Sequence, residues 1–144
     1  MNGVATPTLD PLLGETLRLI EHTREMIALI EVGVDDVEID DLSRLEVVRE
    51  CTRLTARLTA VLSWLLSQKA VAAGEFGLGD ERAFRPLFGI GDERVDPAAM
   101  PGGDPAHSRC DALSALVVES ANLFSRVARL DRLREERRHD PDRA

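Results

Sequence analysis

A heptad pattern of apolar residues in the middle of the chain constrains the fold more than any other feature. Its positions are four and three residues apart in alternation, which places them on one side of a helix: Val47, Cys51, Leu54, Leu58, Val61 and Leu65. A second stripe runs beside it: Leu45, Val48, Thr52, Thr55, Thr59, Leu62 and Leu66. The sequence therefore predicts a long helix over about 42–73 that has more apolar surface than one neighbouring helix can cover.

Helices are also predicted on both sides of this segment. Asp10-Pro11 and Asp104-Pro105 each combine an N-cap acceptor with a proline, whose missing N–H costs nothing at the first helical position. Apolar residues at helical spacing follow both dipeptides. The predicted helices cover about 11–32 and 105–134.

Glycine and proline interrupt the chain between the central helix and the last one. The segment from Gly74 to Gly103 holds seven of the ten glycines and three of the seven prolines, which excludes a long regular element. We expect a flexible connection over 75–104, and a connection of this length is typical of a binding loop or of partial disorder. After Leu133 the chain is almost entirely charged, which predicts a tail over 135–144.

These elements predict an all-α fold of one domain, an antiparallel three-helix bundle with long helices. A chain of 144 residues and 15.8 kDa can enclose a core without disulfides or a metal. With 44% hydrophobic but only 3% aromatic residues, that core is expected to be aliphatic. Cys51 and Cys110 lie far apart in ordinary segments, so we expect reduced thiols.

Charge and hydropathy argue against two classes of partner. Acidic residues outnumber basic ones 26 to 18, for a net charge of −8, whereas nucleic-acid binding needs a concentrated basic surface. No apolar run approaches the ~18 residues of a membrane span, and the first residues lack the basic and apolar regions of a signal peptide. We therefore expect a cytoplasmic protein with no nucleic-acid and no membrane partner.

The combinations of residues that resemble metal sites are incomplete. His107 and Cys110 are three residues apart, but together with Cys51 they supply fewer than the four ligands of a structural zinc site. His22 and Glu25 reverse the Glu-x-x-His order of carboxylate-bridged metal bundles. We expect no metal, no cofactor and no enzymatic activity; a helical-bundle metalloenzyme is the alternative, which elemental analysis tests.

Two groups of residues in the central helix are candidates for protein contacts. Arg49, Arg53 and Arg57 are spaced one turn apart, either as a solvated face paired with Glu46 and Glu50 or as a docking strip for an acidic partner. The second group is assigned to the bundle core or to the interface of a homodimer, and Trp64 in it is the only tryptophan. Its members are Leu58, Leu62, Trp64, Leu65 and Leu66.

Two runs of sequence resemble a small alphaproteobacterial family that includes the regulator of CtrA degradation, RcdA. The run 53–71 has Ser-Trp-Leu-Leu at its centre and is followed by Gly74-Glu75, like the central helix of that family. The run 120–131, with an aromatic residue, an Arg-Val pair and an Arg-Leu-Asp ending, resembles the last helix of the family. Together the two runs cover about a quarter of the chain.

The resemblance implies a dimeric three-helix bundle that acts as an adaptor for regulated proteolysis during the cell cycle. In such a system the adaptor contacts a substrate, the primed ClpX unfoldase of the ClpXP protease or its regulators, and in some cases a cyclic-di-GMP effector. The resemblance also suggests a location at the cell pole, and it carries over no binding residue individually. The alternative is a dimeric regulatory or scaffold protein that binds a small ligand or another partner without any protease.

Overall fold

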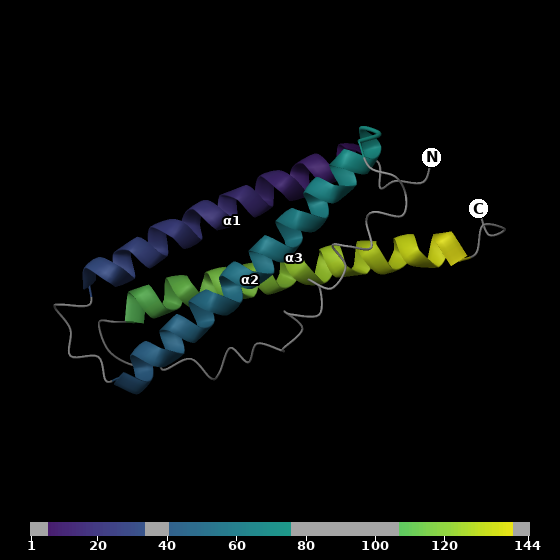
Figure 1. Ribbon diagram of the computed structural model, residues 1–144. Coiled ribbons are helices and arrows are strands. Elements are labelled where there is room, and N and C mark those ends of the chain that lie inside the picture. Colours follow the sequence, from purple (N-terminus) through teal and green to yellow (C-terminus); the bar gives the residue numbers. More distant parts are fainter. Residues whose placement is uncertain (1–5, 34–40, 76–106, 140–144) are drawn as a thin grey trace.

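Three long helices make up the described part of the computed structural model, which covers residues 6–33, 41–75 and 107–139 (Figure 1). They are α1 (Thr6–Gly33), α2 (Asp41–Ala72) and α3 (His107–His139). All three pairs of helices pack against one another. The predicted all-α fold with three packed helices is therefore confirmed, while most of the predicted connection over 75–104 and of the predicted tail lies outside the described residues.

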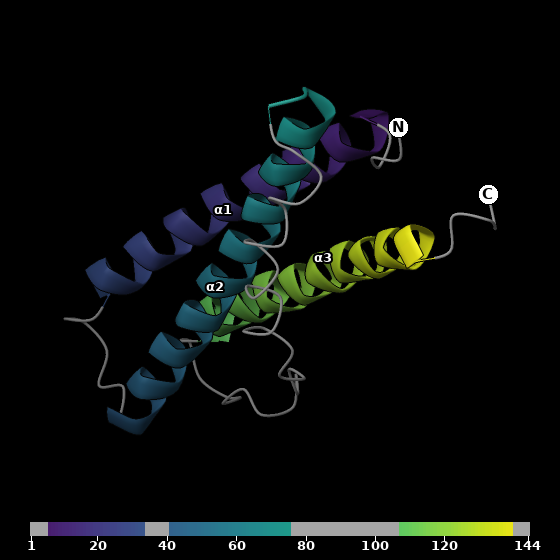
Figure 2. The same cartoon turned by 45° about the vertical axis from the view of Figure 1, so that its right-hand side comes forward.

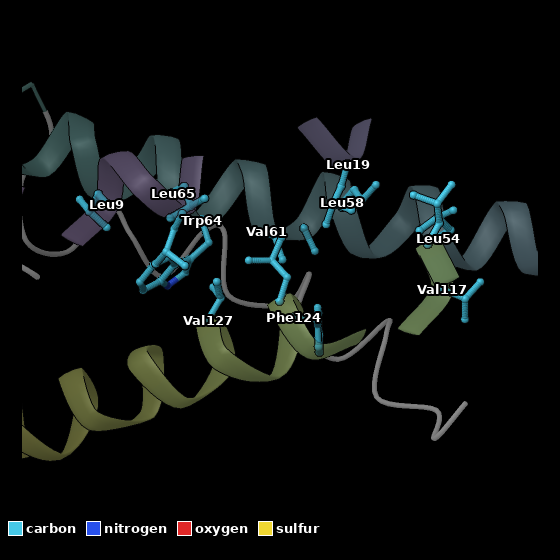
Figure 3. Packing of buried hydrophobic residues seen from close by; sticks show 14 of the residues in the cluster. Leu9, Leu19, Leu54, Leu58, Val61, Trp64, Leu65, Val117, Phe124 and Val127 are labelled. Carbon is cyan, nitrogen blue, oxygen red and sulfur yellow. The ribbon is translucent and has the colours of Figure 1, made fainter. Parts of the chain in front are cut away.

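The predicted antiparallel arrangement holds for α1 but is wrong for α2 and α3, which run parallel (Figures 1 and 2). Lys69 near the end of α2 donates to Asp10 near the start of α1, with 2.6 Å between Nζ and Oδ1. By contrast, Trp64 and Asp131, both in the second halves of their helices, are hydrogen-bonded. Figure 3 shows the same register, because Leu54 lies over Val117 and Trp64 lies over Val127.

The length of the connection between α2 and α3 permits this parallel order. A 32-residue helix such as α2 is about 48 Å long. An extended chain advances about 3.3 Å per residue, so residues 73–106 have enough reach to return from the end of α2 to the start of α3. A short loop would have forced α3 to run back antiparallel to α2.

An aliphatic core lies between the three helices, as the composition predicts. It contains buried leucines from all three helices and buried valines from α2 and α3, with Trp64 and Phe124 as its buried aromatic residues (Figure 3). The members with almost no exposed surface are Leu9, Leu19, Leu54, Val61, Leu65, Leu113, Val117, Leu123 and Val127. Both α1 and α3 place their inner faces against the predicted heptad of α2.

The end of α2 follows its sequence signals closely. Gly74 has a φ of 76°, a conformation that glycine adopts without strain. The Glu75 N–H donates to the Ala70 carbonyl at 2.9 Å and the Gly74 N–H donates to the Val71 carbonyl at 3.0 Å, which is the Schellman pattern of helix termination. The predicted range of 42–73 therefore differs from the observed one by a single residue at each end.

The first helix begins before its predicted start, and the third begins two residues after its predicted start but ends beyond its predicted end. The first begins at Thr6 instead of residue 11, because Thr6-Pro7 is an equally good start signal and Leu9 is fully buried in the added turn. The third ends at His139 instead of residue 134, because Arg, Glu and Leu favour a helix even where no core follows. Arg134 is only 7% exposed. The predicted tail over 135–144 therefore begins too early.

Candidate functional site

The second stripe of α2, which we name the outer α2 stripe, remains uncovered by α1 and α3. Its members are Leu45, Val48, Thr52, Thr55, Thr59, Leu62 and Leu66. Leu45, Val48 and Leu66 are 63%, 59% and 51% exposed, the three threonines are exposed and Leu62 is half-buried. The stripe is about 32 Å long at 1.5 Å per residue, so it follows most of the helix. It combines several large exposed apolar side chains on one continuous face.

The threonines of the stripe have their hydroxyl groups bonded within the helix. Thr52, Thr55 and Thr59 each donate from Oγ1 to the backbone carbonyl four residues earlier, at 2.8 Å. These hydroxyls need no further donor or acceptor when a neighbour covers them, so covering them leaves no unsatisfied polar group. The side chains in the middle of the stripe are therefore small and present no unpaired hydroxyl group, which allows close approach of another helix.

The apolar surface continues onto α1. Asp10 of α1 and Lys69 of α2 form an ion pair, which fixes the register of this antiparallel pair. Leu17 lies two turns after Asp10 in α1, and Leu62 lies two turns before Lys69 in α2. Because the two helices are antiparallel, both leucines lie at the same level along the line where α1 and α2 meet. Leu17 is half exposed. The outer α2 stripe is therefore widest at its C-terminal end.

The predicted arginine strip does not lie on one exposed face. Arg49 is exposed, and no described acidic residue pairs with it, whereas Arg53 lies 3.4 Å from the Glu50 carboxylate, between Nη1 and Oε1. Arg57 is only 3% exposed, so its predicted place on the solvent face is wrong. Four residues exceed one helical turn by about 40°, and two such steps carry position 57 round to the packed side.

Burial also changes the electrostatics of this group. It lowers the pKa of the Arg57 guanidinium, while the Glu50 carboxylate nearby raises that pKa. The Arg57 guanidinium therefore belongs to the packed charge cluster that Glu50 and Arg53 form along α2, and it is not available as a free contact for a partner.

The five residues assigned to the core or a dimer interface divide into two groups. Leu58, Trp64 and Leu65 are buried in the core of the bundle. Leu62 and Leu66 lie on the outer α2 stripe, half-buried and exposed respectively. Only these last two are thus placed where a second molecule can contact them.

The two sequence runs that carry the family resemblance meet in the structure. The run 53–71 lies in α2, and the run 120–131 lies in α3. Trp64 of the first donates from Nε1 to Oδ1 of Asp131 in the second, at 2.9 Å. Asp131 is the last residue of the Arg-Leu-Asp ending of the second run, but the spacing of residues in the sequence did not predict its contact with Trp64. The buried residues of the two runs therefore contribute to the α2–α3 packing, while their exposed residues include part of the outer α2 stripe.

The structure brings together no metal-binding group within its described ranges. No set of three histidine, cysteine, aspartate or glutamate residues there is arranged to hold an ion. His22 is exposed, and its Nδ1 lies 3.5 Å from Arg18 Nη1. Cys51 is half-buried, and burial raises the pKa of its thiol. The side chains of His107 and Cys110 lie outside the described part, so the prediction for that pair remains a prediction.

None of the three helices, as far as the structure describes them, has the length and apolarity required to cross a membrane. The apolar residues of α2 and α3 alternate with charged ones too frequently for that role.

Comparison with known proteins places the sequence in one family. The model of a family described as protein of unknown function (DUF1465) matches residues 1–144. No curated protein and no solved structure matches the chain.

Proposed function

We propose that this chain, which belongs to the DUF1465 family over its whole length, is a dimeric non-enzymatic adaptor that assists regulated proteolysis by ClpXP. The outer α2 stripe is the observation that carries the proposed dimer, because it is apolar surface that the fold of a single chain leaves uncovered. The link to the protease comes from the resemblance of the runs 53–71 and 120–131 to the RcdA family. Its partners in that role are ClpX and its regulators or cargo.

In the proposed dimer, the α2 helices of two copies pack antiparallel along their outer stripes. Side-chain size favours this pairing, because three threonines occupy the middle of the stripe and larger residues occupy both ends. Two crossing helices are closest at their crossing point and diverge from it. Small residues at the crossing and leucines where the helices diverge keep the two surfaces in contact.

The antiparallel pairing is also self-complementary. With Thr55 at the twofold axis, Leu45 of one copy lies opposite Leu66 of the other, and Val48 lies opposite Leu62. Each copy then contributes the same patch, as a closed twofold interface requires. The half-exposed Leu17 of α1 lies beside Leu62 and adds to the area that the second copy covers.

Affinity capture with the full chain as bait tests the link to the protease. Under the proposal, ClpX or its regulators are enriched over a bait in which the stripe carries a charge, Leu66→Glu. Purified ClpXP then degrades a captured cargo faster when the chain is added. A chain that dimerises but captures no protease component, and accelerates no degradation, would instead be a regulatory or scaffold protein.

A further inference from the structure

The C-terminal half of α3 concentrates positive charge on a protein that is otherwise acidic. Between residues 126 and 139 there are six arginines against three acidic residues, whereas the whole chain carries −8. In contrast, α1 has five acidic residues against two basic ones. Figures 1 and 2 both show this end of α3 standing apart from the ends of α1 and α2.

Three of these arginines are exposed and available. Arg126 is held by Glu15 of α1, and Arg134 is buried. Arg129, Arg132 and Arg137 are exposed, and within the described helices no carboxylate pairs with them. As far as the described helices go, the donors of these three guanidinium groups face outward from the bundle without an ion-pair partner.

An apolar side chain lies between two of them. Leu133 is exposed and follows Arg129 by four residues, and Arg137 follows Leu133 by four more. Residues four apart are neighbours on a helix surface, and all three are exposed, so they form one slanting row in which the Cα atom of each arginine lies about 6 Å along the helix axis from that of the leucine. We name the row of Arg129, Leu133 and Arg137, with Arg132 beside it, the α3 basic row.

We infer that the α3 basic row binds an acidic segment of a partner protein that carries one apolar side chain between carboxylates. Leu133 contacts the apolar side chain, and the guanidinium groups pair with the carboxylates on either side. In an extended segment, carboxylates four residues apart are about 13 Å apart, close to the ~12 Å between positions 129 and 137. The row thereby gives the chemistry of one partner of the proposed adaptor.

The acidic segment that precedes α2 cannot occupy the row of its own chain. The end of α1 and the start of α2, between which this segment falls in the sequence, lie at the end of the bundle where α3 begins. The basic row begins some twenty residues later in α3, at least 30 Å away along the helix. The positive charge of the row, on a chain that carries −8 overall, favours an acidic segment of another molecule as its occupant.

A fluorescein-labelled peptide of nine residues, with leucine at its centre and glutamate elsewhere, tests this with the full chain. Fluorescence anisotropy should show saturable binding that weakens as salt is added. Arg129→Gln combined with Arg137→Gln should weaken it about tenfold, the sum of two exposed charge pairs. The matched control, Arg18→Gln with Arg24→Gln on α1, makes the same charge change elsewhere and should leave the affinity within twofold.

Specificity for the apolar residue is tested by replacing the central leucine of the peptide with serine. This change should weaken binding to the unaltered chain and have little further effect on the variant Leu133→Ser. Equal losses in the two arginine double variants would overturn the inference, as would tighter binding of anionic lipid vesicles or single-stranded RNA than of the peptide. No protease takes part in these measurements, so a failure to capture ClpX overturns the proposed function and leaves this inference standing.

Discussion

The contact between Trp64 and Asp131 is a specific polar interaction between α2 and α3. The indole N–H donates to a carboxylate in a partly buried setting, at 2.9 Å. Hydrogen bonds to charged groups contribute more than neutral ones, about 1.5–3 kcal/mol. This bond also fixes the register of two helices that run parallel, since it joins residues at matching depths in the bundle.

Asp131→Ala should therefore lower the free energy of unfolding by about 1–2 kcal/mol, because it leaves the buried indole N–H without its acceptor. Urea unfolding followed by the fluorescence of Trp64, the only tryptophan, measures the change. Asp111→Ala, at an exposed position of the same helix, is the control and should change stability by less than about 0.5 kcal/mol. Equal stabilities for the two variants would show that the bond contributes nothing.

The half-buried thiol of Cys51 should react slowly. Burial raises its pKa, so at a given pH near neutrality less of it is the reactive thiolate than in a free cysteine. Its alkylation rate, followed by peptide mass mapping, should continue to rise at pH values where a free thiol has levelled off. A rate at pH 8 equal to that of a short cysteine peptide would contradict this. Cys51→Ala should cost only about 1 kcal/mol.

At the scale of the element, α2 determines whether the protein is a monomer or a dimer. Leu66→Glu places a charge on the outer α2 stripe, where a second copy would have to bury it unpaired. We expect the dimer dissociation constant to rise at least a hundredfold, with helicity unchanged because Leu66 is exposed in the single chain. Sedimentation equilibrium at tens of micromolar protein measures the proportions of monomer and dimer.

Leu29→Glu supplies the matched control, because Leu29 is equally exposed but lies on α1, away from the stripe. This variant should dimerise as the unaltered chain does. If the unaltered chain is monomeric at tens of micromolar, the proposed interface is wrong. Dissociation by both variants alike would point to a different interface.

The elements were predictable from sequence to the extent that their signals are local. The heptad, the threonine stripe and the stop at Gly74 identified α2 within one residue at each end. The direction of α3 was not predictable, because an apolar stripe packs equally well in either direction and a long connection permits both. The prediction that Arg57 lies on the solvent face was wrong, because residues spaced by four rotate about 40° per step around the helix and share one face only over a short stretch.

At the scale of the whole molecule, the structure places the boundary between bundle and tail near residue 139. A chain that ends at His139 should melt like the full chain, since it loses only residues 140–144. A chain that ends at Leu133 also loses the buried Arg134, and it should melt several degrees lower. Thermal unfolding followed by circular dichroism compares the two. Identical melting temperatures would mean that the last turns of α3 do not contribute to stability.

The parallel course of α2 and α3 has a consequence for chain connectivity. Because α1 is antiparallel to both, α3 ends at the same end of the bundle at which α1 begins. A circular permutant can therefore start at His107, join His139 to Thr6 by a linker long enough to span the separation of these two helix ends, and stop at Glu75. In this permutant each pair of consecutive helices would form an antiparallel hairpin. It would lack residues 76–106, which we expect to be dispensable for folding. Such a permutant should fold faster than the natural order of the same helices, because its contacts are closer in sequence.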